Sequence, residues 1–258
     1  MVHNSRSFPG RHQSLKPVRV LHTSDVHIGG WPPKTSSSAG LDLAITTLQL
    51  IIEAAKTEHV DAVLFAGDLF DSNRVAPEAV AAAADIFATA SLPIVILPGN
   101  HDPLTPDSIF ERFKDTLPGN VHVFRQENGE LIYLRDCALE LWGRPHLTYD
   151  DFEVLGAPDE WVQNTRSKAW RIAVAHGHYV RSKVDERFSY LFRDGDIQAL
   201  EADYLALGHW DIHEAVGGED TPAYYSGSPC RIGSFNLVDL SPEETTVTQV
   251  FLKAGQTM

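Results

Sequence analysis

The chain has 258 residues, of which 43% are hydrophobic, and its formal net charge is −14 at pH 7. This length allows one large domain or two small ones with an ample core, and no stretch approaches the length of a membrane span. So acidic a chain is a poor non-specific binder of nucleic acid, although a local basic patch or a bound metal ion can override the global sign.

The first residues differ in character from the rest of the chain. Residues 1–17 contain basic side chains but no acidic ones, and they lack the apolar stretch of a secretory signal, so we expect a disordered basic tail. The two cysteines, Cys137 and Cys230, are too few for a disulfide framework and have no metal-binding spacing. We expect them to be buried, reduced thiols of a cytoplasmic protein that makes no membrane contact.

Apolar runs that end in polar residues recur along the chain: VRVLHTSDVH, DAVLFAGDLFD, LPIVILPGNHD, RIAVAHGH and DYLALGHWDIH. The first three are separated by two helical stretches. LDLAITTLQLIIEAAKTEH carries Leu41, Ala44 and Leu48 at helical spacing, and PEAVAAAADIFATA opens with Pro77, which suits a first helical turn. This order predicts a parallel sheet joined by crossover helices.

The second half of the chain has a different pattern. After a third short helix around PDSIFERFKDT, the segment VHVFRQENGELIYLRDCALELWG predicts strands joined by a turn at residues 127–130. AYYSGSPCRIG, SFNLVDL and TTVTQVFLK predict further strands, with a turn at Ser241–Pro242. Two sheets with helices packed outside are therefore expected, an α/β arrangement that some schemes class as α+β.

Polar side chains gather where five of the predicted strands end, which is where open sheets bind their ligands. Each has an ordinary structural explanation alone, such as a turn or a satisfied histidine, but five such strand ends are hard to attribute to chance. The residues are Asp25, His27, Asp68, Asp71, Asn100, His101, His176 and His209.

These residue types specify a chemistry. Carboxylate, imidazole and amide oxygen without thiolate favour manganese, iron, zinc or a similar divalent ion. There are too many ligands for one ion, so we expect two, with one carboxylate between them. Two-metal sites, with ions about 3.5–4 Å apart, clamp an in-line displacement at phosphorus.

The motifs DVH, GDLFD, GNHD, the strand-terminal His176 and the Gly-His at 208–209 resemble, in order, the five signature motifs of calcineurin-like metallophosphoesterases. AGDLFDSNR, YLALGHW and YYSGSPCR are similar to the catalytic domain of SbcD-type DNA repair exonucleases. The resemblance implies a four-layer αββα sandwich of two mixed β-sheets flanked by helices. It also implies that residues 18–258 form a single catalytic domain without a cap domain.

The resemblance implies a role for each matched residue. His101 would be catalytic, stabilising the phosphoryl oxygens or protonating the leaving oxygen, while Asp102 would orient His101 and favour its charged form. The nucleophile would be a metal-bound hydroxide, since the cations lower the pKa of water. The two ions, expected to be Mn²⁺ with Fe or Zn as alternatives, would be held by Asp25 and His27 on the first, Asp68 between both, and Asn100, His176 and His209 on the second.

The last motif departs from the family pattern Gly-His-x-His. GHWDIH puts Asp211 at the final position and His213 two residues later on the same predicted strand face. Direct alignment favours Asp211 as a ligand of the first ion, and His213 competes only if the loop bulges. Asp71 is expected to orient a metal-binding histidine. The candidates for substrate binding are Arg74, His178, Ser228 and Arg231.

The expected function is hydrolysis of phosphodiester bonds by a dinuclear phosphoesterase, with DNA as the substrate of an SbcD-type exonuclease or endonuclease. The acidic body favours an alternative, small nucleotides or other small phosphoesters, and a non-catalytic metal-binding scaffold is a second alternative. SbcD-type nucleases continue into DNA-capping and ATPase-binding segments. Because this chain stops about where the catalytic domain closes, we do not expect an SbcC-type ATPase partner.

Overall fold

The structure of the protein, a computed structural model, describes residues 14–30, 37–156, 161, 168–218 and 221–253. Of the expected tail, residues 1–13 lie outside this part of the chain. None of the helices in the described ranges is both long and apolar enough to cross a bilayer.

The predicted alternation of strands and helices builds the first sheet. β1 (Val18–Thr23), β2 (Ala62–Ala66) and β3 (Ile94–Leu97) are parallel neighbours. The connecting helices α1 (Ser37–Thr57) and α2 (Pro77–Ala88) return the chain to the same edge, and Pro77 opens α2 as predicted. The carboxyl ends of these strands therefore meet at one edge.

Three more strands complete this sheet, in the order β14-β13-β1-β2-β3-β4. β4 (Val121–Val123) is parallel to β3, whereas β13 (Ser234–Leu240) is antiparallel to β1 and pairs with β14 (Thr245–Phe251). The turn predicted between the last two strands is confirmed, because the Ser241 amide donates to the Glu244 carbonyl at 3.0 Å.

The second sheet has the order β11-β12-β10-β7-β6-β5, and its inner strands β12, β10, β7 and β6 are parallel. Two edge strands, β11 and β5, are antiparallel to their neighbours, and β8 pairs with β9 in a separate two-stranded sheet. The bounds are β5 Glu130–Leu134, β6 Leu139–Gly143, β7 Trp170–His176, β8 His178–Tyr179, β9 Leu191–Phe192, β10 Tyr204–Gly208, β11 Glu214–Val216 and β12 Ala223–Tyr225.

The remaining elements are short helices and 3₁₀ turns in the segments between strands. They are α3 (Ile109–Arg112), α5 (Asp194–Ala199), α6 (Pro229–Ile232) and the 3₁₀ turns η1 (Arg135–Cys137) and η2 (Asp185–Arg187).

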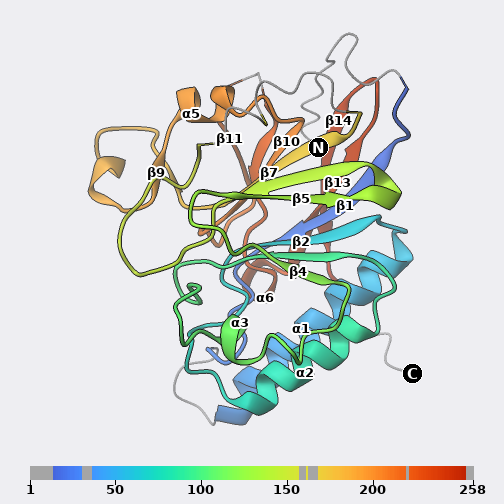
Figure 1. The fold of residues 1–258 in the computed structure, drawn as a ribbon, viewed down its shortest axis with the longest axis vertical. Helices are drawn as coiled ribbons and strands as arrows, with labels where there is room; N and C mark the ends of the chain where they lie inside the picture. The colour runs from blue at the N-terminus through green and yellow to red at the C-terminus, as the bar shows by residue number, and fades with distance from the viewer. Residues whose placement is uncertain (1–13, 31–36, 157–160, 162–167, 219–220, 254–258) are drawn as a thin grey trace.

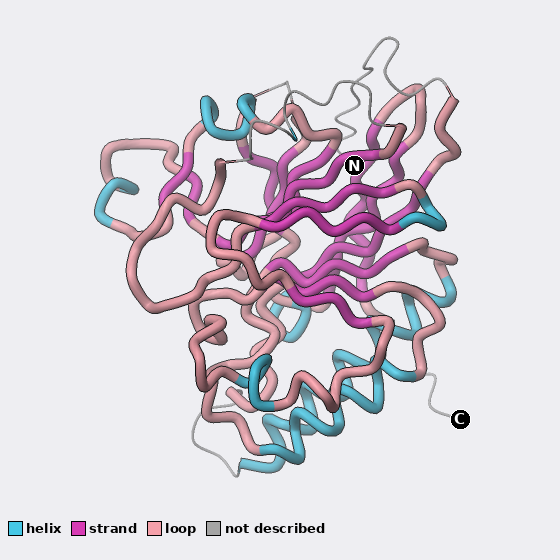
Figure 2. The backbone as a smooth tube through the Cα atoms, viewed as in Figure 1, coloured by secondary structure: helices cyan, strands magenta, loops and turns pink. Residues whose placement is uncertain are grey.

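The sheets and helices form layers with a separate apolar cluster at each junction. α1 and α2 lie side by side against the first sheet (Figure 1), where α1 buries Leu48, Ile51 and Ile52. The burial of each such side chain stabilises the folded state by about 1.5–3 kcal/mol. Figure 2 shows the strands of the two sheets stacked as layers. A second cluster fills the space between the two sheets, and a third lies on the outer face of the second sheet, beneath α5 and loops. The predicted sandwich of two mixed sheets flanked by helices is confirmed.

One local prediction is confirmed and another was wrong in detail. The turn predicted at residues 127–130 is present and joins β4 to β5, which belong to different sheets, so the chain crosses between layers there. AYYSGSPCRIG is strand only through Tyr225; α6 follows, because Pro229 presets a helical first turn and Gly233 (φ 68°) ends it.

Candidate metal centre

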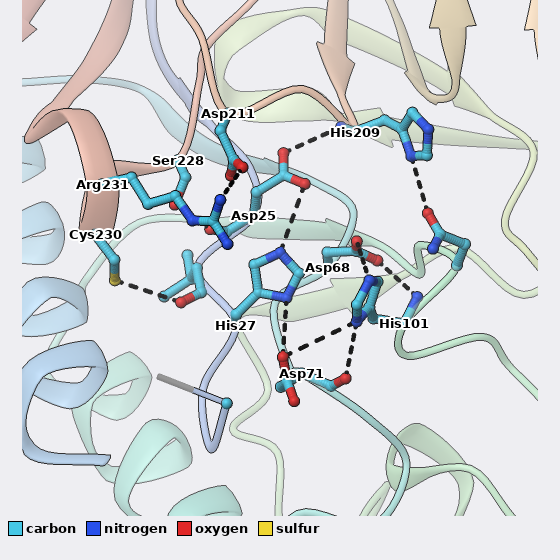
Figure 3. Close-up of a pocket in the computed structure, with 13 residues that line it drawn as sticks. Asp25, His27, Asp68, Asp71, His101, His209, Asp211, Ser228, Cys230 and Arg231 are labelled. Atoms are coloured by element: carbon cyan, nitrogen blue, oxygen red, sulfur yellow. Dashed lines mark hydrogen bonds and ion pairs between the residues drawn. The ribbon is translucent and has the colours of Figure 1, made fainter. Parts of the chain in front are cut away.

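The carboxyl ends of strands from both sheets meet at one cavity of about 350 Å³. Loops after β1, β2 and β3 supply acidic, imidazole and amide groups from the first sheet, and the end of β10 supplies an imidazole from the second. Figure 3 shows the side chains of Asp25, His27, Asp68, Asp71 and His101 gathered around one space. The polar residues that line the cavity include Asp25, His27, Asp68, Asp71, Asn100, His101, His209, Asp211, Ser228 and Arg231.

The loops after β1 and β2 are fastened to each other by main-chain hydrogen bonds. The amides of Asp25 and His27 donate to the carbonyls of Gly67 and Asp68 at 3.0 and 3.1 Å, and Ile28 forms a bridge with Phe70. The DVH and GDLFD motifs are therefore one structural unit.

Several expected ligands have left-handed backbone, a conformation that costs non-glycine residues about 1–3 kcal/mol each. The φ angles are 55° at Asp25, 53° at His27, 53° at Asp68 and 106° at His209. Such strain clusters at functional sites, where the surrounding structure compensates for it. Here the compensation includes the His209 amide, which donates to Asp25 Oδ2 at 3.1 Å.

Two motif glycines make room for these ligands. A Cβ atom on Gly67 would lie 2.0 Å from His176 Nδ1, and the φ of 94° at Gly67 also disfavours a side chain. A Cβ atom on Gly99 would lie 2.2 Å from Asp68 Oδ1. Each Gly-Asp or Gly-Asn pair of the motifs therefore supplies one expected ligand and makes room for another: Gly67 for His176 and Gly99 for Asp68.

His176, at the end of β7, is fully buried, and its surroundings fit a cation. Its Nδ1 lies 2.9 Å from the Ala66 carbonyl, which can only accept, so Nδ1 carries a proton. Nε2 faces two oxygens, Asn100 Oδ1 at 2.9 Å and Asp68 Oδ2 at 3.2 Å, so it needs a proton or a metal ion between it and them. A cation among these three atoms would satisfy all of them, as metal-bound histidines commonly donate their other N–H to a carbonyl.

The pKa of His176 reflects the same crowding of oxygens. Burial lowers this pKa, but the nearby Asp68 and Asp25 carboxylates outweigh burial and raise it to about 9. His209 lies on the other side of Asn100, with Nδ1 3.0 Å from Asn100 Oδ1. Burial and the proximity of His176 lower the pKa of His209 to about 3. The ring is therefore uncharged at neutral pH, which is the form that binds a metal ion.

Asp68 belongs to two groups of metal-binding atoms. Its carboxylate lies with His27 and His101 in one group and with Asp25 and His176 in the other; within each group the candidate ligand atoms are at most 4.8 Å apart. Burial raises the pKa of Asp68, but His176 lowers it below its usual range, which keeps the carboxylate charged. The second group joins Asp25 to His176, whereas the resemblance assigns these two residues to different ions.

His27 completes the first-sheet side of the cavity. Its buried Nδ1 lacks a hydrogen-bond partner among the described residues, although Asp71 Oδ1 faces it at 3.4 Å. Burial lowers the pKa of His27, but the Asp71 and Asp68 carboxylates raise it overall. The other nitrogen, Nε2, lies 3.9 Å from Asp25 Oδ1.

The role expected for Asp102 is wrong, because its carboxylate does not contact the ring of His101. Asp102 is fully buried and accepts hydrogen bonds from the amides of Phe70 (2.9 Å) and Gly99 (2.7 Å), so it fixes the loop itself. Burial and the nearby Asp68 raise the pKa of Asp102 to about 7. The His101 ring is oriented by Asp71 instead, whose carbonyl accepts from Nδ1 at 3.0 Å.

The loop that holds Asp211 and His213 is not a strand, so the period-two argument does not apply to it. Asp211 lines the cavity and forms an ion pair with Arg231. His213 Nδ1 instead lies 2.8 Å from Asn236 Oδ1, and His213 is not among the described residues that line the cavity. Ser228 donates to the Asp25 carbonyl at 2.7 Å, which supports the ligand loop.

Two other candidates for substrate binding, Arg74 and His178, are not among the described residues that line the metal cavity. Arg74 lines a second cavity beside it. His178 is buried, stacks on Phe188 at 4.3 Å between ring centroids, and accepts from Trp210 Nε1 at 3.2 Å. Sequence reasoning missed Cys230, which is half-buried rather than buried and lines the metal cavity. Its place next to Ser228 and Arg231 in YYSGSPCR was the available signal.

Comparisons with known proteins agree on one family. The model of the calcineurin-like phosphoesterases matches residues 18–212. The chain is 27% identical to the SbcD component of the nuclease SbcCD of Bacillus subtilis, covering 93% of this chain and 71% of that protein. It is 25% identical to the DNA double-strand break repair protein Mre11 of Methanosarcina acetivorans, covering 90% of this chain but only 38% of that protein.

Two solved structures have a similar fold at low identity. The crystal structure of TT1561 of Thermus thermophilus has a TM-score of 0.58 and 17% identity, covering 92% of this chain and all of that one. A putative 5′-nucleotidase from Staphylococcus aureus has a TM-score of 0.54 and 14% identity, covering 94% of this chain and 56% of that one.

Proposed function

Because the chain belongs to the calcineurin-like phosphoesterase family and is a metal-dependent phosphoesterase, we propose that it holds two divalent ions and hydrolyses phosphodiester bonds. The observation that carries this proposal is the membership of Asp68 in both groups of metal-binding atoms. A single buried carboxylate shared in this way suits two ions a few ångströms apart.

Seven side chains would hold the ions. When bound, the ions supply positive charge to the phosphate and lower the pKa of nearby water. The oxygen and nitrogen donor set suits Mn²⁺, with Fe or Zn as alternatives. The proposed ligands are Asp25, His27 and Asp211 on the first ion, Asp68 between both, and Asn100, His176 and His209 on the second.

His101 is the proposed proton-transfer residue. Its side chain is 44% exposed, and its Nδ1 is committed to the Asp71 carbonyl. Nε2 is therefore the atom that can exchange a proton with a substrate in the cavity, either to stabilise the phosphoryl oxygens or to protonate the leaving oxygen.

Arg231 is the proposed phosphate-binding side chain of this cavity. It lies half-exposed at the cavity wall, in an ion pair with Asp211. Its planar guanidinium has the geometry that pairs with two oxygens of a phosphate. This arrangement compensates for the acidic wall, which would otherwise repel an anionic substrate.

Two substrate classes are supported by different observations. The names of the SbcCD and Mre11 relatives point to the phosphodiesters of DNA. The net charge of −14 and a cavity at the small end of ligand sites favour small nucleotides. We propose that either substrate is cleaved at a diester, and that small diesters need no partner protein.

The test is Mn²⁺-dependent hydrolysis of bis-(p-nitrophenyl) phosphate beside the monoester p-nitrophenyl phosphate. We expect faster cleavage of the diester and a loss of at least about 100-fold in His101→Ala, with two ions still bound. His122→Ala, on the edge strand β4, is the matched control and should keep full activity. Native protein that holds two ions but cleaves neither compound would contradict the proposal and favour a scaffold.

A further inference from the structure

A second cavity, of about 860 Å³, has a wall that starts one residue beyond the metal cavity, because Ser72 lines the second cavity and Asp71 lines the first. The same two segments build both cavities: Asp71 and His101 line the metal cavity, and the residues that follow them in the chain line the second one. Arg74 is three residues beyond Asp71, so their Cα atoms are at most about 11 Å apart. The lining residues are Ser72, Asn73, Arg74, Thr105, Asp107, Arg112 and Tyr149.

The charge of this lining is opposite to that of the whole chain. Two arginines face one aspartate, and Asp107 already accepts a hydrogen bond from Thr105 Oγ1 at 3.0 Å. The guanidinium of Arg74 has no hydrogen-bond or ion-pair partner within the described ranges; only its amide is bonded, to Ser72 Oγ at 3.3 Å. In so acidic a protein, an unpaired arginine at a cavity indicates an anionic ligand.

An aromatic ring lies exposed in the same cavity. The side chain of Tyr149 is 64% exposed, whereas its backbone carbonyl is held by the Tyr190 hydroxyl at 3.1 Å. A fixed backbone with a free ring face is suited to stacking on a base. The ring and the two cations together match the groups that bind nucleotide chains.

The walls of the cavity are fixed by internal hydrogen bonds. Asn73 Nδ2 donates to the Pro103 carbonyl at 2.7 Å, and Asn73 Oδ1 accepts from the Ile109 amide at 2.9 Å. Arg112 donates to the Asn73 carbonyl and lies 5.4 Å from the Phe113 ring centroid. A cavity organised in this way loses little entropy when a ligand binds.

We propose that the second cavity binds the nucleotide next to the scissile phosphate, with Arg74 and Arg112 on its phosphate and Tyr149 on its base. This inference rests on the proposed phosphodiesterase function. It specifies a substrate with at least two phosphates and an unpaired base at this position, because a base within a duplex is already stacked.

The test measures binding of phosphorothioate oligothymidylates of one to four nucleotides to the Mn²⁺-loaded protein by calorimetry. In native protein, we expect affinity to rise about tenfold when the second phosphate is added. In Arg74→Gln this gain should fall to threefold or less, and the slope of log affinity against log salt should decrease by about one.

Two sets of variants make the test specific. Arg135→Gln is the charge control and should keep the tenfold gain, because Arg135 lies in η1 before the start of β6, whereas Tyr149 follows the end of β6. Tyr149→Ala should weaken binding of the dinucleotide about fivefold or more, whereas Tyr149→Phe and native protein should bind alike. Tyr149→Ala should not change binding of an abasic analogue.

The outcomes separate this inference from the proposed function. A phosphate gain that survives in Arg74→Gln, or that Arg135→Gln abolishes equally, overturns the second-cavity assignment. If native protein cleaves no diester while the Arg74→Gln effect on binding holds, the hydrolytic proposal fails and the binding site stands. If it cleaves diesters but the gain is insensitive to Arg74, the binding site alone is wrong.

Discussion

The carboxylate of Asp68 is held from several directions. Its Oδ1 accepts from the His101 amide at 2.9 Å, its Oδ2 lies 3.2 Å from His176 Nε2, and its backbone is left-handed. Only 3% of the side chain is exposed, so it cannot turn toward solvent. Asp68 is therefore held in one orientation beside the other candidate ligand atoms.

Asp68→Asn should separate the shape of this side chain from its charge. The amide oxygen can still accept from His101, so the fold should be retained, but the bridging charge is lost. We expect the metal content, measured by inductively coupled plasma mass spectrometry after desalting, to fall from two ions to one or none. Asp239→Asn, at an exposed pair with Arg19, is the control and should keep both ions. Retention of two ions by Asp68→Asn would contradict a bridging role.

At the scale of elements, β1 and β10 belong to different sheets and are joined by a buried hydrogen bond. His22 on β1 is fully buried, and its Nδ1 lies 2.8 Å from the hydroxyl of Tyr204 on β10. Burial is the main cause that lowers the pKa of His22 to about 3. The ring is therefore neutral in the folded protein across the physiological range.

Stability should decrease as the pH is lowered, because of His22. Its pKa is about 6.5 when unfolded and about 3 when folded, so below pH 6.5 the unfolded state binds the additional proton. Above pH 6.5 His22 does not change the free energy of unfolding with pH. Below pH 6.5 it lowers that free energy by up to about 1.4 kcal/mol per pH unit. Urea unfolding in EDTA at pH 8 to 5 measures this slope.

The control variants for this slope differ in whether they keep the imidazole. His22→Gln should lower the slope of the unfolding free energy against pH but not abolish it, because glutamine does not titrate while His209, whose pKa is also lowered, still does. Tyr204→Phe should lower stability at every pH but keep the slope. Equal slopes in His22→Gln and native protein would mean that another group is responsible.

The sequence was informative about elements whose pattern is local. Apolar runs and Pro77 identify the strands and helices around β1 to β3, and parallel pairing then brings Asp25, Asp68 and Asn100 to one edge. The direction of a side chain within a turn depends on backbone angles that no periodicity encodes. That is why the inward turn of Asp102 was missed.

The same limit applies to contacts between distant loops. The pairing of Asp211 with Arg231 joins the loop after β10 to α6, and neither segment has a pattern that identifies the other. The unpaired state of Arg74 among the described residues also depends on which side chains fold beside it. Such features require the assembled structure.

At the scale of the whole molecule, the metal centre connects the two sheets. Asp25, Asp68 and Asn100 follow strands of the first sheet, whereas His176 and His209 come from the second. Because the native arrangement assembles these ligands and an unfolded chain does not, bound ions stabilise the folded state.

Mn²⁺ should therefore raise the melting temperature of the metal-free protein. At an ion concentration 100 times the Kd, one site contributes about 2.7 kcal/mol, which corresponds to a rise of roughly 5–10 °C for a chain of this size. Differential scanning fluorimetry with and without EDTA measures the shift. We expect Asp68→Asn to show less than half of it, and an equal shift in that variant would place the stabilising ion elsewhere.

The left-handed backbone at Asp25, His27, Asp68 and His209 also restricts how this site can change over evolutionary time. Glycine occupies that conformation freely, and asparagine, aspartate and histidine occupy it at a lower cost than β-branched and bulky residues do. Neutral substitutions at these positions are thus restricted to a few residue types. A descendant that lost its metal would first carry asparagine or glycine there, with the loops intact, and reversion would need single substitutions only.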